Sequence, residues 1–446
     1  MSVKPSLVSD PIAPLLFRMT FPVMGGIISL MLFNLVDAYF IGMLGTDALA
    51  AVTFTFPVTF TLISLSIGLG IGTSAVVGRL LGANSLDLVK RRTTDAALLA
   101  IILSLLLTII GWLTLEPLFL LLGVTPDLMP YIRDYMHIWY LGTLFVVLPR
   151  AISSALRASG NTLIPGLVMI GSALLNGILD PLLIFGWGPV PAMGVKGAAL
   201  ATLISWMVLT VCIFLLPQVR KQLLSFERPS PAQIIESWSV IGRIALPAII
   251  SSILTPVSTA ILTRIVAQYG NDAVASFGVG SRIEAISLIV VFALSMTLPP
   301  FVSQNLGAEK IERVYRGVMG CFIFAIIWQG MVWAVLLIIQ DPLVSAFAEP
   351  ESDLARNLHW FIWLVPMGLG LQGVIILANS TMNALHRPMI ALRLSILRLF
   401  IFYIPVCASG AWIFGLLGVF GGAVVANALM AVVSWWTVRR AIRSIS

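Results

Sequence analysis

The chain has 446 residues, of which 59% are hydrophobic and only 10% are charged. A soluble protein of this size cannot cover so much apolar side chain with polar surface, so the composition excludes a water-soluble fold and predicts that lipid is the solvent. The net charge of +7 does not indicate nucleic-acid binding, because the basic residues form short clusters between apolar runs.

Twelve apolar segments are long enough to cross a bilayer, which takes roughly 20 apolar residues in a helix. They lie at approximately 16–42, 50–76, 94–120, 131–156, 163–187, 195–216, 241–267, 275–301, 317–340, 356–380, 389–412 and 418–438. The first follows a polar stretch, 1–14, and has no small-residue cleavage pattern, so we expect it to be retained rather than removed as a signal peptide. The sequence therefore predicts an all-α polytopic membrane protein with twelve transmembrane helices.

Lysine and arginine are distributed unevenly among the loops. If both termini lie in the cytoplasm, 19 of the 26 basic residues fall on the cytoplasmic side or at the cytoplasmic ends of spans. Three fall on the outer side of the membrane. The remaining four lie further within spans and are Arg150, Arg264, Arg282 and Arg398. Because positively charged loops stay in the cytoplasm, this bias predicts that both termini are cytoplasmic.

An internal repeat divides the chain into halves. The segment GTDALA at 45–50 returns as GNDAVA at 270–275, and LGA at 81–83 returns at 306–308, both at an offset of 225. A later pair, GVKGA at 194–198 and GVFGG at 418–422, has an offset of 224. Several motifs held in one register indicate a duplicated structural unit.

Each repeat contains six spans, so both copies enter and leave on the same side of the membrane and form parallel repeats. Parallel six-helix repeats around a central cavity are the architecture of alternating-access carriers. The polar stretch between the halves is typical of a cytoplasmic linker. We therefore predict an N-lobe at 1–217, a linker at 218–238 and a C-lobe at 239–446.

Three acidic residues lie deep in the predicted spans: Asp37, Asp180 and Glu284. Intramembrane acids are costly, so they are candidates for function. The topology places Asp37, Asp180 and Thr202 at a similar depth in the outer third of one lobe. Asn176 precedes Asp180 by four residues, which puts both on one helix face.

This group suits cation coupling. Desolvated carboxyl groups that influence one another can exchange protons near neutral pH, and the oxygens of Asp37, Asn176, Asp180 and Thr202 could equally hold a dehydrated Na⁺. Pro22 and Pro181 each free a backbone carbonyl, so we expect the first and fifth spans to bend there. The alternative is that the two aspartates only hydrogen-bond neighbouring helices.

The second lobe has no copy of this group, because Leu262 stands at the position equivalent to Asp37. Its deep acid, Glu284, shares a span with Arg282, which offers a counter-ion although two residues of separation do not bring the side chains together. The pair is either structural or an auxiliary proton or substrate-cation site. In the first lobe, Tyr135 and His137 of the fourth span either support the aspartates or hydrogen-bond between helices.

These motifs resemble the multidrug and toxic compound extrusion (MATE) transporters, and specifically their bacterial DinF-like branch, over essentially the whole chain. The segments that carry the resemblance are Pro22 with NLVD at 34–37, GRLLGA at 78–83, ALRASGN at 155–161, Asn176 with DP at 180–181, GVKGAA at 194–199, GSRIE at 280–284 and QNLGA at 304–308. The first of these includes Asn34, which we predict to support the aspartate site.

The resemblance implies an exporter of varied, often cationic drugs, driven by inward H⁺ or Na⁺ movement. We expect a monomer in the bacterial inner membrane. The resemblance also implies that Asp37 is the essential protonation site and that protonation bends the first span at Pro22. One departure matters: NorM-like relatives carry an acid in the seventh span for a C-lobe Na⁺ site, and 241–267 contains none. Coupling through the N-lobe is therefore favoured.

Other partners and functions are not indicated. The three cysteines lie in separate apolar runs, so we expect no disulfide, no metal site and no cofactor. A lipid-linked precursor flippase of the same superfamily should have a strongly basic cavity, which four basic residues within spans do not provide. An intramembrane enzyme is disfavoured because no GxSxG, HExxH or DDxxD motif occurs.

Overall fold

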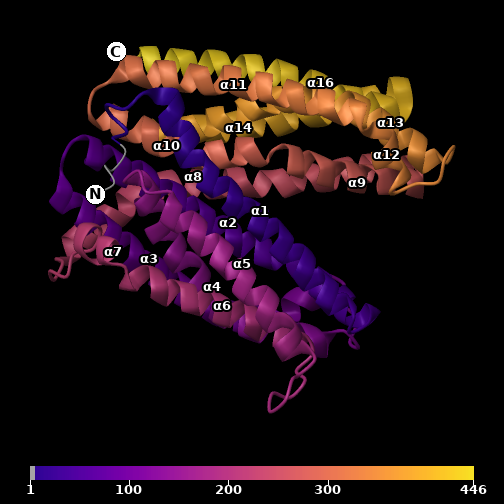
Figure 1. Cartoon of the computed structure of the whole chain (residues 1–446), viewed down its shortest axis with the longest axis horizontal. Coiled ribbons are helices and arrows are strands. Elements are labelled where there is room, and N and C mark those ends of the chain that lie inside the picture. The colour runs from indigo at the N-terminus through magenta and orange to yellow at the C-terminus, as the bar shows by residue number, and fades with distance from the viewer. Residues whose placement is uncertain (1–5, 446) are drawn as a thin grey trace. The chain divides into compact units, whose positions relative to one another are not determined.

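The computed structural model describes residues 6–445, and these are almost entirely helical (Figure 1). An isolated β-bridge joins Trp187 to Val190. Within the described residues, eleven segments are long and apolar enough to cross a membrane. The prediction of an all-α, multi-pass membrane protein is confirmed.

The twelfth predicted span lies in the last of these segments, Pro388–Arg443, whose 56 residues exceed what one crossing needs. The backbone leaves helical geometry at Gly415, where φ is 62° and ψ is −144°. Beyond that turn the chain packs back on itself, because a β-carbon on Gly422 would lie 2.9 Å from the α-carbon of Cys407. The segment is therefore an antiparallel pair of spans, as the sequence predicted.

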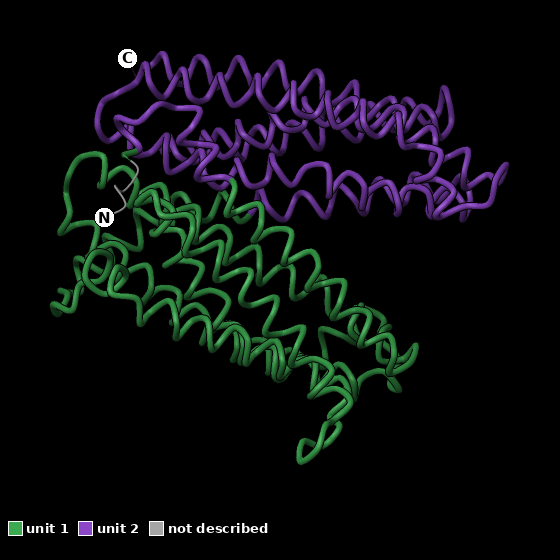
Figure 2. The backbone as a smooth tube through the Cα atoms, viewed as in Figure 1, with its two compact units in different colours: residues 1–6, 21–249 green, residues 7–20, 250–446 purple. Residues whose placement is uncertain are grey.

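The chain forms two compact units (Figure 2). Unit 1 contains Phe21–Ile249, and unit 2 contains Leu7–Thr20 and Ile250–Ser446. The first eight helices are α1 (Ile12–Gly42), α2 (Thr46–Gly82), α3 (Leu86–Leu121), α4 (Met129–Ala158), α5 (Leu163–Ile184), α6 (Val195–Leu215), α7 (Pro217–Gln222) and α8 (Pro231–Val266). Helices α2 to α7 belong wholly to unit 1, whereas α1 and α8 are each divided between the units.

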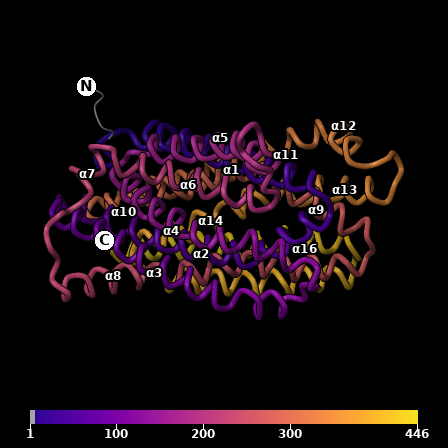
Figure 3. The backbone as a smooth tube through the Cα atoms, turned by 90° about the horizontal axis from the view of Figure 1, so that it is seen from below, coloured from indigo at the N-terminus to yellow at the C-terminus, as the bar shows by residue number. Residues whose placement is uncertain are grey.

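Several spans of unit 2 are interrupted. Its elements are η1 (Ala267–Tyr269), α9 (Asn271–Ser287), α10 (Ile289–Gly307), α11 (Ile311–Ile338), α12 (Gln340–Ser345), α13 (Asp353–Leu364), η2 (Val365–Gly368), α14 (Leu369–Ala384), α15 (Pro388–Ile396), η3 (Leu397–Tyr403) and α16 (Ile404–Arg443). The predicted span 275–301 is broken at Leu288, and 356–380 contains the 3₁₀ turn η2. In a view turned by 90°, the long helices of unit 2 still follow a common direction (Figure 3).

The division of α1 and α8 follows the repeat. Residues 7–20, which join unit 2, correspond at offset 225 to 232–245, which join unit 1. In unit 2 the Thr20 and Thr297 hydroxyls lie 2.9 Å apart. The equivalent positions in unit 1 are Ala245 and Gly72, where a β-carbon on the glycine would lie 3.2 Å from that of the alanine. Each repeat thus packs the start of its first helix against the second helix of the other repeat.

Polar contacts hold 7–20 in unit 2. The carbonyl of Leu7 accepts a hydrogen bond from Asn305 Nδ2 at 2.9 Å and further bonds from the Arg313 guanidinium. Lys310 Nζ donates to the carbonyl of Val8 at 3.2 Å. These bonds satisfy carbonyl groups that precede the first turns of α1 and would otherwise need water.

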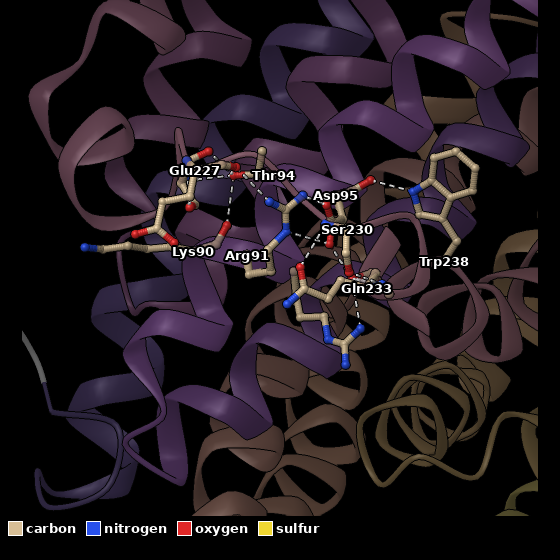
Figure 4. A network of polar contacts seen from close by, with 11 residues as sticks. Lys90, Arg91, Thr94, Asp95, Glu227, Ser230, Gln233 and Trp238 are labelled. Atoms are coloured by element: carbon tan, nitrogen blue, oxygen red, sulfur yellow. Dashed lines mark hydrogen bonds and ion pairs between the residues drawn. The ribbon is translucent and has the colours of Figure 1, made fainter. Parts of the chain in front are cut away.

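The start of α8 is held in unit 1 by a network around Asp95 of α3 (Figure 4). Asp95 is fully buried, forms an ion pair with Arg91 and accepts a hydrogen bond from the Ser237 hydroxyl. Its backbone carbonyl accepts from Trp238 Nε1 at 2.9 Å. Asp95 was not among the three acids predicted to lie deep in spans, so the sequence did not indicate this buried carboxylate.

A capping box defines where α8 begins. Ser230 and Gln233 bond each other's backbone amides reciprocally, at 3.1 and 3.3 Å, and Pro231 occupies the first turn. The predicted linker, 218–238, therefore includes a short helix, α7, and the first turns of α8. The lobe boundaries predicted from the repeat stay a prediction, since the compact units follow packing rather than the repeat junction.

Candidate coupling site

The polar group predicted in the first lobe assembles between α5 and α6. Asn176 and Asp180 of α5 are fully buried, and Thr202 of α6 is 4% exposed. Asn176 Nδ2 donates to Asp180 Oδ1 and to Thr202 Oγ1, both at 3.2 Å. The four-residue spacing on α5 accounts for the first bond. One amide group therefore joins the two helices at membrane depth.

Asp37 faces this group from α1. Its side chain is half-buried, and it interacts electrostatically with Asp180. Tyr135 of α4, which is 7% exposed, interacts with both aspartates. The structure therefore brings together residues of four helices, α1, α4, α5 and α6, as the sequence predicted for three of them and proposed for Tyr135.

Three oxygen atoms in this site lack a hydrogen-bond donor. Asp37 Oδ1, Asp180 Oδ2 and Asn176 Oδ1 are all buried, and no described residue donates to them. Buried polar atoms are normally satisfied, so such orphans need an explanation. All three are acceptors, and a proton or a hard cation that prefers oxygen ligands would supply what they lack. We call Asp37, Tyr135, Asn176, Asp180 and Thr202 the coupling site.

Two predicted supporting residues lie apart from it. Asn34 is exposed, and no hydrogen bond joins it to the coupling site among the described residues. The His137 ring packs edge-on against Trp112 of α3 at 6.4 Å, and its carbonyl accepts from Trp112 Nε1. The His137 ring thus packs against α3, and the hydrogen bond to Trp112 comes from its backbone rather than from its side chain.

The predicted hinge residue Pro22 lies inside α1, at a close contact between α1 and α5. A β-carbon on Gly166 of α5 would lie 2.9 Å from the Pro22 carbonyl carbon. A β-carbon on Gly26, one turn further along α1, would likewise lie 3.0 Å from the β-carbon of Met169. Pro181 also lies inside its helix, directly after Asp180. The glycines let the backbone of α1 at Pro22 lie directly against α5.

We expect Gly166→Ala to destabilise the protein by about 1–3 kcal/mol, because overpacking at this contact forces α1 and α5 apart. Gly177→Ala on the same helix is the matched control, since nothing lies within 4 Å of a β-carbon there and alanine favours helix by up to about 1 kcal/mol. Thermal unfolding in detergent distinguishes the two variants. If Gly166→Ala is as stable as the wild type or more stable, the α1–α5 contact tolerates a larger residue at position 166.

A second polar cluster, half-buried except for the buried Asn427, lies in unit 2. Glu284 Oε1 accepts from Gln372 Nε2 at 2.8 Å, and Gln372 Oε1 accepts from Asn427 Nδ2 at 3.4 Å. Asn427 Oδ1 accepts from the Arg398 guanidinium at 3.3 Å, and Arg398 lies over the Tyr403 ring. Two side-chain amides thus join a carboxylate to a guanidinium within the membrane, with Arg398 on the π-helical turn η3.

The counter-charge of Glu284 in this cluster is Arg398, with which it interacts electrostatically. Arg282, the counter-ion considered from the sequence, is exposed and makes no ion pair with Glu284 among the described residues. Residues two apart on a helix point in different directions, which explains the difference. Gln372 and Asn427 were missed because uncharged amides in apolar spans give no strong signal. Arg398 was noted only as a basic residue within a span.

Comparison with known proteins agrees with this architecture. The MatE family model matches residues 22–182 and again 247–408, so the two matches begin 225 residues apart. The chain is 36% identical over 434 residues to the FAD transporter of Shewanella oneidensis, covering 97% of this chain and 96% of that protein. It is 26% identical to the multidrug export protein MepA of Staphylococcus aureus MSSA476, covering 95% and 92%.

Solved structures give the same result. The bent form of the Vibrio cholerae MATE transporter VcmN has a TM-score of 0.92 and 34% sequence identity, covering 97% of this chain and 98% of that one. An outward-facing MATE family transporter of the MOP superfamily has a TM-score of 0.91 at 24% identity, covering 98% and 97%, and shows likeness of fold alone. On the two family-model matches and these relatives, the chain belongs to the MATE family of transporters.

Proposed function

We propose that this transporter is an H⁺-coupled efflux antiporter and that Asp37 and Asp180 carry the coupling proton. The observation that carries the proposal is the set of three buried oxygens in the coupling site that lack donors. Protonation of one carboxyl group supplies a donor and removes the repulsion between the two aspartates. Neither a cofactor nor a resident metal ion takes part.

In this mechanism the proton changes the shape of the N-lobe. Proton binding neutralises the half-buried side chain of Asp37. Helix α1 can then move against α5 at the Pro22–Gly166 contact. A transmembrane potential contributes about 2.3 kcal/mol per charge per 100 mV, which is enough to bias a two-state change. We place the protein in the bacterial inner membrane, as a monomer with both termini in the cytoplasm. Na⁺, held by the same oxygens, is the alternative coupling ion.

The substrates proposed first are amphiphilic, cationic drugs, in keeping with the multidrug export relatives. A second candidate is a flavin dinucleotide. The FAD transporter of Shewanella oneidensis is 36% identical over nearly its whole length, compared with 26% for MepA. Drug export and dinucleotide export make opposite demands on the charge of a binding site, so measurements can separate them.

Transport by the purified protein in proteoliposomes tests the coupling ion. We expect an outside-acid pH gradient to drive efflux of a fluorescent cation without Na⁺, and we expect a Na⁺ gradient at equal pH to drive none. The same vesicles loaded with FAD test the second substrate. Efflux driven by Na⁺ alone would replace H⁺ with Na⁺, and transport insensitive to both gradients would refute the antiport proposal.

A further inference from the structure

Two arginines lie in the second half of α4, in unit 1, and the coupling site uses neither. Arg150 and Arg157 are seven residues apart, so they occupy one face of the helix with an axial rise of about 10 Å between their α-carbons. Arg157 is 9% exposed and donates to Ser154 Oγ at 2.7 Å. Ser154 therefore lies between the two arginines on that face.

Neither guanidinium has a carboxylate partner. None of the ion pairs within residues 6–445 includes Arg150 or Arg157. The two arginines instead interact electrostatically with each other, and like charges repel. The other arginine of α4, Arg133, is about half exposed and pairs with Glu116. Arg150 lies within the predicted span and Arg157 is buried at the end of α4, and unpaired charge in such places is costly and is usually retained for a function.

This face of α4 lies close to α2. A β-carbon on Gly70 of α2 would lie 2.7 Å from Ser154 Oγ and 3.4 Å from Arg150 Cγ. The glycine thus leaves room for Ser154 and Arg150 beside α2. Arg150 is only half-buried, so part of its side chain stays accessible. The negative end of the α4 dipole favours a cation at Arg157, but this effect fades within the last turn and does not account for Arg150.

We propose that Arg150, Ser154 and Arg157 form an anion-binding subsite for a phosphate or pyrophosphate group. Guanidinium groups bind phosphate oxygens through two parallel hydrogen bonds, and a hydroxyl between them provides another donor. Two arginines on one helix face, two turns apart and close enough to interact electrostatically, suit a ligand with two linked phosphates. A negatively charged ligand also removes the repulsion between the two guanidinium groups.

The ligand has two possible sources with the same chemistry. One is a phosphate-bearing substrate such as a dinucleotide, and the other is the phosphate of an anionic lipid. If the ligand is a transported substrate, the role of the subsite in transport rests on the proposed function. Equilibrium binding, however, needs no ion gradient. A failure of the antiport proposal therefore leaves the binding result unaffected, and the reverse also holds.

Binding of FAD, riboflavin and inorganic pyrophosphate to the detergent-solubilised full chain tests the subsite. Riboflavin has the ring system of FAD without phosphate, so the FAD-to-riboflavin affinity ratio reports the phosphate contact. We expect Arg150→Gln and Arg157→Gln each to lower this ratio, and the affinity for pyrophosphate, about tenfold or more, as for a lost charge-assisted hydrogen bond. Arg133→Gln, on the same helix, should leave both unchanged.

Further arms separate the outcomes. Phosphatidylglycerol added as a competitor, against phosphatidylcholine, shows whether a lipid phosphate occupies the subsite. If arginine-dependent binding appears only with phosphatidylglycerol, the anion subsite stands and its ligand is lipid. If a glutamine variant fails to fold, Arg150→Lys and Arg157→Lys keep the charge without the paired hydrogen bonds and should lower the ratio less. Folded variants that bind FAD, pyrophosphate and phosphatidylglycerol like the wild type would overturn the proposal.

Discussion

Replacing Asp37 with asparagine should abolish proton-driven efflux while leaving the protein folded. Asparagine has nearly the same size but cannot take up a proton, so Oδ1 of residue 37 no longer alternates between a charged and a neutral state. Coupled flux should therefore fall to the background of protein-free vesicles. Substrate-stimulated proton uptake into proteoliposomes, followed with a pH-sensitive dye, measures it.

Two variants complete this experiment. Asp37→Glu keeps a titratable carboxyl group with a longer side chain and should retain part of the flux. Asp47→Asn removes an exposed carboxylate from the first turn of α2 and should behave like the wild type. Normal proton uptake by the Asp37→Asn protein would remove Asp37 from the coupling mechanism. Asp180 would then be the remaining candidate within the coupling site.

The second large effect concerns stability rather than transport. Asp95→Asn should destabilise unit 1 by about 3 kcal/mol, because removing one partner of a buried ion pair leaves an uncompensated charge. Asp95 is fully buried, whereas the Arg91 side chain is 14% exposed and can regain some water, which places the effect at the lower end of the usual range. The start of α8 loses the carboxylate that accepts from Ser237.

Thermal unfolding in detergent and limited proteolysis of residues 223–230 measure this effect. We expect a lower midpoint and faster cleavage, because the segment before α8 is held by Arg91, Thr94 and the contacts of Asp95. Asp87→Asn is the matched control, since Asp87 is an exposed acid on the same helix. If the Asp95→Asn protein has the same unfolding midpoint as the Asp87→Asn control, the network does not hold the start of α8.

Much of the architecture could be predicted from the sequence. Apolar length marked the spans, and the offset of 225 between motifs agrees with the separation of the two family-model matches. The hydrogen bond from Asn176 to Asp180 follows from their spacing on one helix, and the contact with Thr202 follows from equal depth in neighbouring spans. Such features depend on local periodicity and on the fixed thickness of a bilayer.

Other features depend on contacts between distant segments, which periodicity does not encode. Ser237 reaches Asp95 across 142 positions of sequence, so the burial of that carboxylate was not visible beside Arg91 and Arg92. Gln372 and Asn427, likewise, are ordinary polar residues until the fold joins them to Glu284. The exchange of helix starts between the repeats was likewise not predictable, because a hydropathy pattern marks a span without indicating its neighbours.

That exchange bears on how the duplicated chain arose. In each repeat the first helix begins against the other copy, as in the Thr20–Thr297 contact and its counterpart at Ala245 and Gly72. A single copy alone would leave this surface uncovered, so an unduplicated ancestor would have needed two molecules that traded helix starts, as in a swapped dimer. In the fused chain the exchange is intramolecular and has a far higher effective concentration.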